Sequence, residues 1–177
     1  GLESAQVVEW LLAGPPVPVE RVVNLMGNHE QMMLAAIARA DAEAGDLWLR
    51  NGGADSLMSW GVQRNVAQQD WASRIPVPHL VFLRDLAMQH RIGPYLFVHA
   101  GIRPGVPLAQ QARQDLLWIR EPFLSSKRDH GAIIVHGHSP RREPFVGTSR
   151  IGIDTGAVIG GSLTCVVLEG DKLGFLY

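Results

Sequence analysis

The chain has 177 residues, 46% of them hydrophobic, and a formal net charge of −1 at pH 7. This length suits one domain that buries its own core, and the balanced charge excludes a strongly basic surface for nucleic acid or an anionic membrane. No apolar stretch is long enough to cross a bilayer. The single cysteine, Cys165, excludes an internal disulfide and fits a reducing compartment, so we expect a cytoplasmic protein.

Helical and strand-like segments alternate along the chain. Helical spacing and composition predict helices over 2–13, 30–44 (ended by Gly45), 77–90 and 107–119. Apolar runs predict strands over 21–26 (buried on both faces), 95–98, 132–135, 150–153, 162–168 and 173–177, with a final hairpin turn at Gly170-Asp171. Segment 46–78 is expected to form short helices and loops, as a small cap. The alternation predicts a single layered α/β domain over residues 1–177.

Three short phrases follow three of the predicted strands: GNHE at 27–30, HAG at 99–101 and HGH at 136–138. Open α/β sheets bind their ligands at such strand ends. Asn28 can bind a metal through its amide oxygen, and His99 and His138 can do so through imidazole nitrogens. A mixed oxygen and nitrogen donor set suits Mn, Fe, Zn or Co better than Ca. The sequence therefore predicts one metal site assembled from three separated corners.

Residues beside these ligands suggest supporting roles. His29 directly follows Asn28, and imidazole exchanges protons near neutral pH, so His29 is a candidate proton donor. Glu30 is expected to tie the loop rather than take part in catalysis. His136 is expected to play a structural or supporting role. Asp154 has two open interpretations, a hydrogen bond to a ligand histidine or the cap of a turn.

In this order and at strand ends, the three phrases resemble the calcineurin-like metallophosphoesterases, and more closely their bacterial and phage-type serine/threonine phosphoprotein phosphatases. WLRNGG at 48–53, LLWIREPF at 116–123 and IDTGAVIGGSLTCVVL at 153–168 agree with this resemblance. It covers nearly the whole chain and implies a layered α/β/β/α sandwich of mixed sheets.

The resemblance also implies roles for single residues. Asn28, His99 and His138 would bind one ion of a two-metal site, with Mn as the expected metal. His29 would be the catalytic proton donor. Arg120 would hold phosphoryl oxygens, because the planar guanidinium binds two of them at once. Arg103 is a weaker candidate for the same anion.

The chain departs from the family pattern at its start. The family's GDxHG and GDxxDRG phrases do not occur, and Gly1 matches the last glycine of the second. We therefore expect an N-terminally incomplete fold without the first metal's Asp and His or the bridging Asp. Neutral ligands leave the charge of a dication uncompensated, so the chain is expected to hold at most one ion, weakly. Exposed strand edges also predict marginal stability or self-association.

Three functions remain open. The first is a bacterial-type serine/threonine protein phosphatase that hydrolyses phosphomonoesters by attack of a metal-bound hydroxide. Its substrates would be phosphorylated proteins or small phosphoesters, with no nucleic acid or membrane partner. The second is a symmetrical diadenosine tetraphosphatase, which shares these phrases. The third is a non-catalytic fragment or remnant. We favour the first, and we expect the activity of this chain alone to be impaired because the ligands of the first metal are missing. The oligomeric state stays open.

Overall fold

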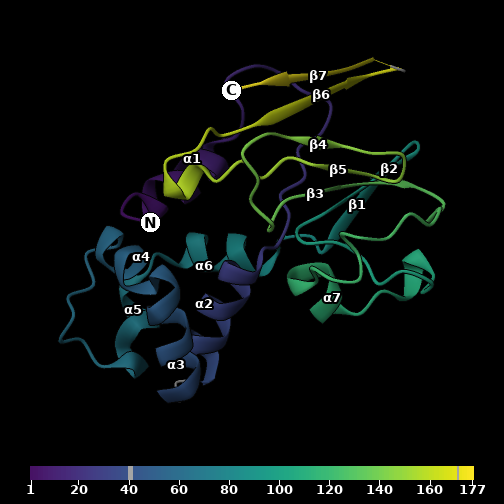
Figure 1. Ribbon diagram of the computed structural model, residues 1–177. Coiled ribbons are helices and arrows are strands. Elements are labelled where there is room, and N and C mark those ends of the chain that lie inside the picture. Colours follow the sequence, from purple (N-terminus) through teal and green to yellow (C-terminus); the bar gives the residue numbers. More distant parts are fainter. Residues whose placement is uncertain (40–41, 171) are drawn as a thin grey trace. The chain divides into compact units, whose positions relative to one another are not determined.

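The computed structural model describes residues 1–39, 42–170 and 172–177 (Figure 1). The chain forms two compact units, Gly1–Ala87 and Met88–Tyr177. The expectation of a single domain, with a cap at 46–78, stays a prediction.

The first unit is built from helices. They are α1 (Ser4–Ala13), α2 (Asn28–Arg39), α3 (Ala42–Trp48), α4 (Ala54–Ser59), α5 (Trp71–Arg74) and α6 (Val77–Arg84), with a wide turn at Leu49–Gly53 and a 3-10 turn at Gln68–Asp70. Helix α1 packs against α4 and α6, and α2 packs against α3 and α6. The buried apolar side chains include Met32, Met33, Trp48, Leu57 and Leu80. None of the helices described in either unit has the length and apolar character needed to span a bilayer.

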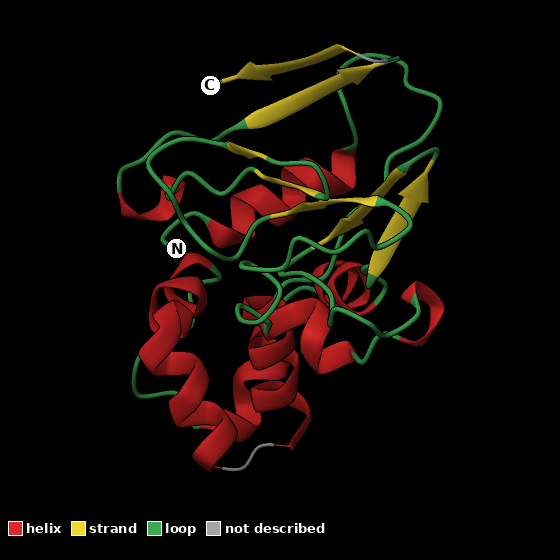
Figure 2. Ribbon diagram, turned by 45° about the vertical axis from the view of Figure 1, so that its right-hand side comes forward, coloured by secondary structure: helices red, strands yellow, loops and turns green. Residues whose placement is uncertain are grey.

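The second unit contains a five-stranded mixed sheet in the order β1-β2-β3-β5-β4 (Figure 2). Its strands are β1 (Gln89–Ile92), β2 (Tyr95–Val98), β3 (Ile133–His136), β4 (Phe145–Val146) and β5 (Arg150–Gly152). Strands β2, β3 and β5 are parallel neighbours, whereas β1 and β4 run antiparallel at the two edges. The carboxyl ends of the three central strands therefore lie at one rim of the sheet.

One hydrophobic cluster joins this sheet to the segment that contains the 3-10 turn Leu108–Gln110 and helix α7 (Arg113–Trp118). Its fully buried members come from β2, β3, α7 and the loops that follow them. They are Leu96, Val98, Ala100, Ile102, Leu116, Ile119, Phe123 and Ile134. This packing fixes the residues that follow β2 and α7, which include the HAG phrase and Arg120.

The end of the chain forms a second, two-stranded sheet. After a 3-10 turn at Ala157–Ile159, β6 (Cys165–Glu169) pairs antiparallel with β7 (Lys172–Leu176). The predicted hairpin is confirmed, because Glu169 pairs with Lys172. Gly170 has a φ of +60°, as a tight turn requires. Asp171, the other predicted turn residue, lies outside the described residues.

The predicted mixed α/β fold is confirmed, and several elements match closely. Strand β2 has the predicted bounds, and α1, β3, β5 and β7 lie within two residues of theirs. The predicted strand over 21–26 is wrong. Only Leu25 forms a bridge, to Ala87, and Val22 is 50% exposed rather than buried on both faces. A strand needs a pairing neighbour along its length, and the bonds to Ala87 reach only Asn24 and Met26.

Three predicted helix limits are also wrong. Helix α3 continues through Gly45 to Trp48. Gly45 has no side chain, and this leaves room for the side chain of Gln68. The helix expected over 77–90 stops at Arg84, and His90 pairs with Phe97 in the β1–β2 hairpin. The helix expected over 107–119 is split, because Gln111 has an extended backbone and uses its side chain to bind the Arg103 backbone.

Candidate functional site

The HAG and HGH phrases meet at the carboxyl ends of the neighbouring parallel strands β2 and β3. The Gly137 N–H donates to the His99 carbonyl at 2.8 Å, which joins the two corners directly. The His99 and His138 rings are both half-buried, with centroids 5.1 Å apart and planes inclined by 59°. The sheet thus brings together two of the three predicted metal ligands.

His138 occupies an unusual backbone conformation. It has a φ of +61°, and among the described residues it is the one non-glycine with a positive φ. The Ser139 N–H donates to the Gly137 carbonyl at 2.7 Å and closes a three-residue turn around His138. Such a conformation strains a residue with a Cβ and is found mainly where function requires it. The Trp118 ring meets the His138 ring edge-on at 6.2 Å.

The geometry of this pair can be compared with what a shared ion requires. When two imidazoles bind one ion, each metal–nitrogen bond is about 2.1 Å long. If the nitrogen–metal–nitrogen angle lies between a right angle and a tetrahedral angle, the two ring centroids are roughly 4.5 to 5.2 Å apart. The observed separation of 5.1 Å lies in this range. No group of three His, Cys, Asp or Glu side chains suited to a metal occurs in the described parts of the chain. The separation of the two rings is compatible with a shared ion, and the ligand assignment stays a prediction.

Arg120 lies beside the HGH corner. It follows the end of α7, and its side chain is exposed. Its Nη2 donates to the His138 carbonyl at 3.4 Å. One end of the guanidinium is thus anchored beside the histidine pair, while the arginine stays accessible to an anion. This position is compatible with the phosphate-binding role, which stays a prediction.

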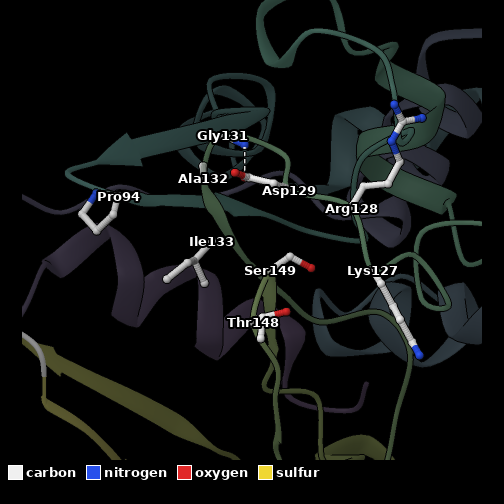
Figure 3. Close-up of a pocket in the computed structure, with 9 residues that line it drawn as sticks. All are labelled: Pro94, Lys127, Arg128, Asp129, Gly131, Ala132, Ile133, Thr148 and Ser149. Atoms are coloured by element: carbon white, nitrogen blue, oxygen red, sulfur yellow. Dashed lines mark hydrogen bonds between the residues drawn. The ribbon is translucent and has the colours of Figure 1, made fainter.

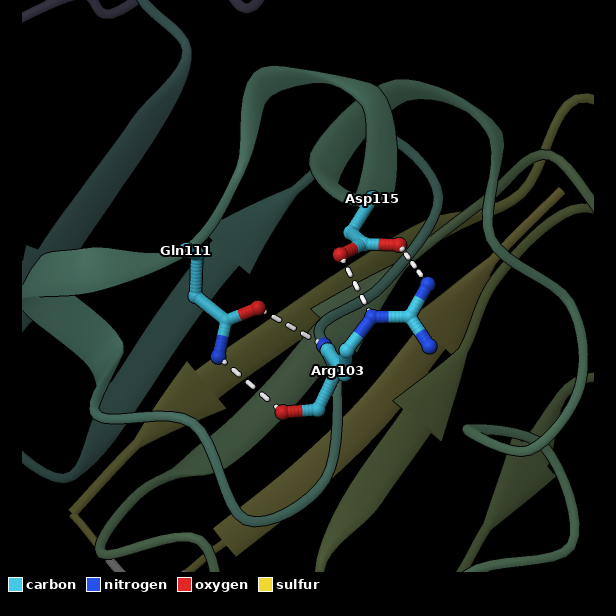
Figure 4. A network of polar contacts seen from close by, with 3 residues as sticks. All are labelled: Arg103, Gln111 and Asp115. Atoms are coloured by element: carbon cyan, nitrogen blue, oxygen red, sulfur yellow. Dashed lines mark hydrogen bonds and ion pairs between the residues drawn. The ribbon is translucent and has the colours of Figure 1, made fainter.

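Arg103, the weaker candidate for the anion, forms an ion pair with Asp115. Its Nε and Nη2 donate to the two carboxylate oxygens of Asp115 at 2.8 and 2.5 Å (Figure 4). The Gln111 side chain also accepts from the Arg103 N–H and donates to the Arg103 carbonyl. The hydrogen bond and charge of Asp115 raise the pKa of Arg103. Arg103 therefore ties the loop after HAG to α7, and a contact of its guanidinium with an anion stays a prediction.

Behind the corner, His136 and Arg150 form a buried polar pair. Arg150 Nη1 lies 3.2 Å from His136 Nε2, and His136 Nδ1 lies 3.0 Å from the Gly137 carbonyl. Because arginine can only donate, Nε2 is the acceptor and Nδ1 carries the proton. Burial lowers the pKa of His136 to about 4, which keeps the ring neutral and able to accept. The pair therefore fixes the Gly137 carbonyl on which the strained turn closes.

Asp154 caps a turn. Its Oδ1 accepts the Gly156 N–H at 3.0 Å, and Gly156 has a φ of +75°. Of the two interpretations left open by the sequence, the structure shows this one.

The GNHE residues belong to the first unit, where they open α2. Asn28 is 5% exposed, and His29 is exposed. Glu30 Oε2 accepts the Gly27 N–H at 2.9 Å, and the Gln31 N–H donates to the Gly27 carbonyl. This is half of a capping box, with Gly27 as the N-cap. Glu30 therefore ties the loop, as expected. The roles of Asn28 and His29 stay predictions.

The sequence did not single out Arg150, Asp115 or Trp118, which support the corner. Arg150 offers a signal in retrospect. It opens the apolar strand RIG and is only 6% exposed, and arginine is almost never buried without partners. Asp115 and Trp118 stand in a helical segment without any local feature that marks them, so only the folded chain reveals them.

No protein-family model matches the chain. It is 32% identical over 153 residues to serine/threonine-protein phosphatase 1 of Salmonella typhimurium, an alignment covering 81% of this chain and 64% of that protein. The chain thus spans less than two thirds of this relative. It also superposes on the crystal structure of a candidate diadenosine tetraphosphatase with a TM-score of 0.62 and 20% identity, over 97% of this chain and 71% of that one.

The structural likeness confirms the predicted metallophosphoesterase-like fold, and its low identity limits it to the fold. The sequence likeness is independent and extends over most of the chain. Similarity to a bacterial serine/threonine phosphatase agrees with the resemblance that the sequence phrases indicated.

Proposed function

We propose that the chain acts as a metal-dependent phosphoesterase of the bacterial serine/threonine protein phosphatase type. The observation that carries the proposal is the His99–His138 pair, whose centroids are 5.1 Å apart with Arg120 bound to the His138 carbonyl. A cation site beside an accessible guanidinium suits the binding of a phosphoryl group. Homology to a protein named as a serine/threonine phosphatase supports the substrate class.

A divalent ion, with Mn expected, would supply an activated water and neutralise charge on the phosphoryl oxygens. His99 and His138 would hold it through imidazole nitrogens, and the tight turn around His138 limits the freedom of that ring. Arg120 would bind phosphoryl oxygens with the part of its guanidinium that does not contact the His138 carbonyl. From the GNHE phrase we also propose Asn28 as an amide-oxygen ligand.

His29 is proposed as the donor of a proton to the departing oxygen. An alkoxide is a poor leaving group and needs this proton, whereas a nitrophenolate does not. His29→Asn is therefore expected to slow the hydrolysis of a phosphoserine peptide much more than that of p-nitrophenyl phosphate. An equal loss on both substrates would remove His29 from the role of proton donor.

The metal site is tested first, by isothermal titration of the chain with Mn²⁺. His99→Ala and His138→Ala are each expected to weaken binding by about tenfold or more. His90→Ala, on the edge strand β1, serves as the control and is expected to leave binding unchanged. Binding that is equal in all four proteins would overturn the site.

The substrate is tested with the Mn²⁺-loaded chain. Release of phosphate from a phosphoserine peptide is expected, and Arg120→Ala should reduce it. Symmetrical cleavage of diadenosine tetraphosphate without phosphopeptide hydrolysis would overturn the protein phosphatase assignment in favour of the second function considered. Metal binding without turnover of either substrate would contradict an enzymatic function of this chain.

A further inference from the structure

A pocket of about 570 Å³ lies in the second unit (Figure 3). It is lined by Pro94, Lys127, Arg128, Asp129, Gly131, Ala132, Ile133, Thr148 and Ser149. Ile133 is the first residue of β3 and His136 the last. At about 3.3 Å per residue, the pocket opens roughly 10 Å from the HGH corner, at the amino ends of the parallel strands. Its volume is typical of ligand sites.

The pocket combines an apolar floor with a polar, cationic rim. Pro94, Ala132 and Ile133 supply the apolar surface. The hydroxyls of Thr148 and Ser149 point toward the side on which Lys127 lies (Figure 3). No carboxylate of the described residues lies within ion-pair distance of Lys127. Lys127 and two hydroxyl groups thus line one side of the pocket, and Asp129 is the acidic residue of the same lining.

The neighbouring loop is held in place by its own hydrogen bonds. Asp129 Oδ1 accepts the Gly131 N–H at 2.8 Å, and Arg91 Nη2 donates to the Gly131 carbonyl at 3.2 Å. The Asp129 carboxylate is therefore turned toward its own loop, where it competes less with a bound anion. Because this loop is already ordered, less conformational entropy is lost when a ligand binds beside it.

We propose that this pocket binds an acidic peptide segment, in which a carboxylate side chain stands next to an apolar one. The carboxylate would meet Lys127 and the two hydroxyls, and the apolar side chain would lie on Ile133 and Pro94. A nucleotide base is disfavoured because no aromatic side chain lines the pocket. Free phosphate would leave the apolar floor unused, and the Arg128 guanidinium points away from the pocket (Figure 3).

Such a pocket would give a protein substrate a second point of attachment outside the catalytic site. This use as a docking site rests on the proposed phosphatase function, whereas the binding of an acidic peptide does not. A direct binding measurement therefore separates the two, because it needs neither metal nor turnover.

The probe is a fluorescein-labelled peptide of alternating leucine and glutamate, followed by anisotropy at low salt. Lys127→Ala is expected to weaken its binding about fivefold, as for loss of a partly exposed ion pair. Thr148→Val is expected to weaken it further. Lys172→Ala is the matched control, because Lys172 is the chain's other lysine and is also exposed, but on β7. Replacing glutamate by glutamine in the peptide should abolish the difference between Lys127→Ala and the wild type.

Three results would overturn the proposal. The first is equal binding by the wild type and Lys127→Ala. The second is a glutamine peptide that binds as tightly as the glutamate peptide, since the pocket would then be only apolar. The third is displacement of the peptide by inorganic phosphate at much lower concentrations than by acetate, which would assign the pocket to phosphate. Circular dichroism of each variant verifies that the fold is retained.

Discussion

At the scale of single residues, Arg150 is the least expected feature of the second unit. It is 6% exposed, and no carboxylate among the described residues lies within ion-pair distance. Its guanidinium stacks 3.9 Å from the centroid of the Phe145 ring and donates to the Leu124 carbonyl at 2.9 Å and to His136. The cation is thus stabilised by an aromatic ring face and by neutral hydrogen-bond acceptors. These acceptors in turn need the arginine as their hydrogen-bond donor.

Removing the guanidinium should therefore be costly. Arg150→Met keeps much of the apolar stem but leaves His136 Nε2 and the Leu124 carbonyl buried without their donor. We expect the free energy of unfolding to fall by about 2 to 3 kcal/mol, measured by urea denaturation. Arg142→Met, at an exposed arginine, is the control and should change it by less than about 0.5 kcal/mol. Equal stability of the two variants would contradict the role given to Arg150.

The lowered pKa of His136 predicts how stability depends on pH. Burial holds the pKa near 4 in the folded chain, against 6.5 for a solvated histidine. Between these values the unfolded chain binds the extra proton, so acid favours unfolding. The contribution is complete above pH 6.5 and is lost as the pH falls toward 4, by up to about 3 kcal/mol. Urea denaturation at pH 7 and pH 5 should show this loss in the wild type and a smaller one in His136→Gln. The same loss in both would refute the assignment.

At the scale of elements, the HAG and HGH corners follow β2 and β3, and each contains a glycine. The two glycines differ in how much space a side chain would have. A Cβ on Gly101 would overlap the Phe123 ring and lie 2.9 Å from Ile119 Cγ2, both in the core. A Cβ on Gly137 would meet nothing closer than the His99 carbonyl at 3.7 Å, an ordinary contact. HAG therefore needs its glycine for packing, and HGH does not.

The two alanine variants make a matched pair. Gly101→Ala is expected to lower the free energy of unfolding by about 1 to 3 kcal/mol, because the core must shift to admit a methyl group. Gly137→Ala should stay within about 0.5 kcal/mol of the wild type. Thermal unfolding of both variants measures the difference. A Gly137 variant that is the less stable of the two would show that the packing around HAG has been misjudged.

The elements that were predicted well are those whose local composition marks their bounds. YLFV is apolar throughout and stands between Gly93-Pro94 and HAG, so the bounds of β2 follow from local composition. Strand β1 carries no such signal, since QHRI suits a helix equally well and becomes a strand only by pairing with β2. RVVNLM shows the converse. It looks like a buried strand, yet only its end finds a pairing neighbour in the described chain.

The candidate site divides in the same way. The proximity of His99 and His138 could be predicted, because parallel strands end at one rim. The salt bridge of Arg103 could not, since Asp115 stands 12 residues further along and local sequence carries no record of that pairing. Nor could the strained turn at His138, which depends on the His136–Arg150 pair across two strands.

At the scale of the whole molecule, charge and exposed apolar surface act together. The net charge is −1 at pH 7 and the isoelectric point is about 6.7, so electrostatic repulsion between copies is weak near neutrality. Large apolar side chains are exposed between β5 and β6: Val158 by 91%, Ile159 by 78% and Leu163 by 80%. Exposed apolar side chains of this kind favour association when repulsion is low.

The chain is therefore expected to associate most strongly near pH 6.7 and less at pH 8.5, where its net negative charge is larger. Sedimentation velocity over a range of concentrations measures this directly. Val158→Ser should reduce the association, because it removes one of these exposed apolar side chains. Val77→Ser is the matched control, since Val77 is 70% exposed at the start of α6, outside that segment. If Val77→Ser reduces association as much as Val158→Ser, general apolar exposure and not the segment between β5 and β6 is the cause. Association that is insensitive to both pH and Val158 would mean that neither net charge nor this segment governs it.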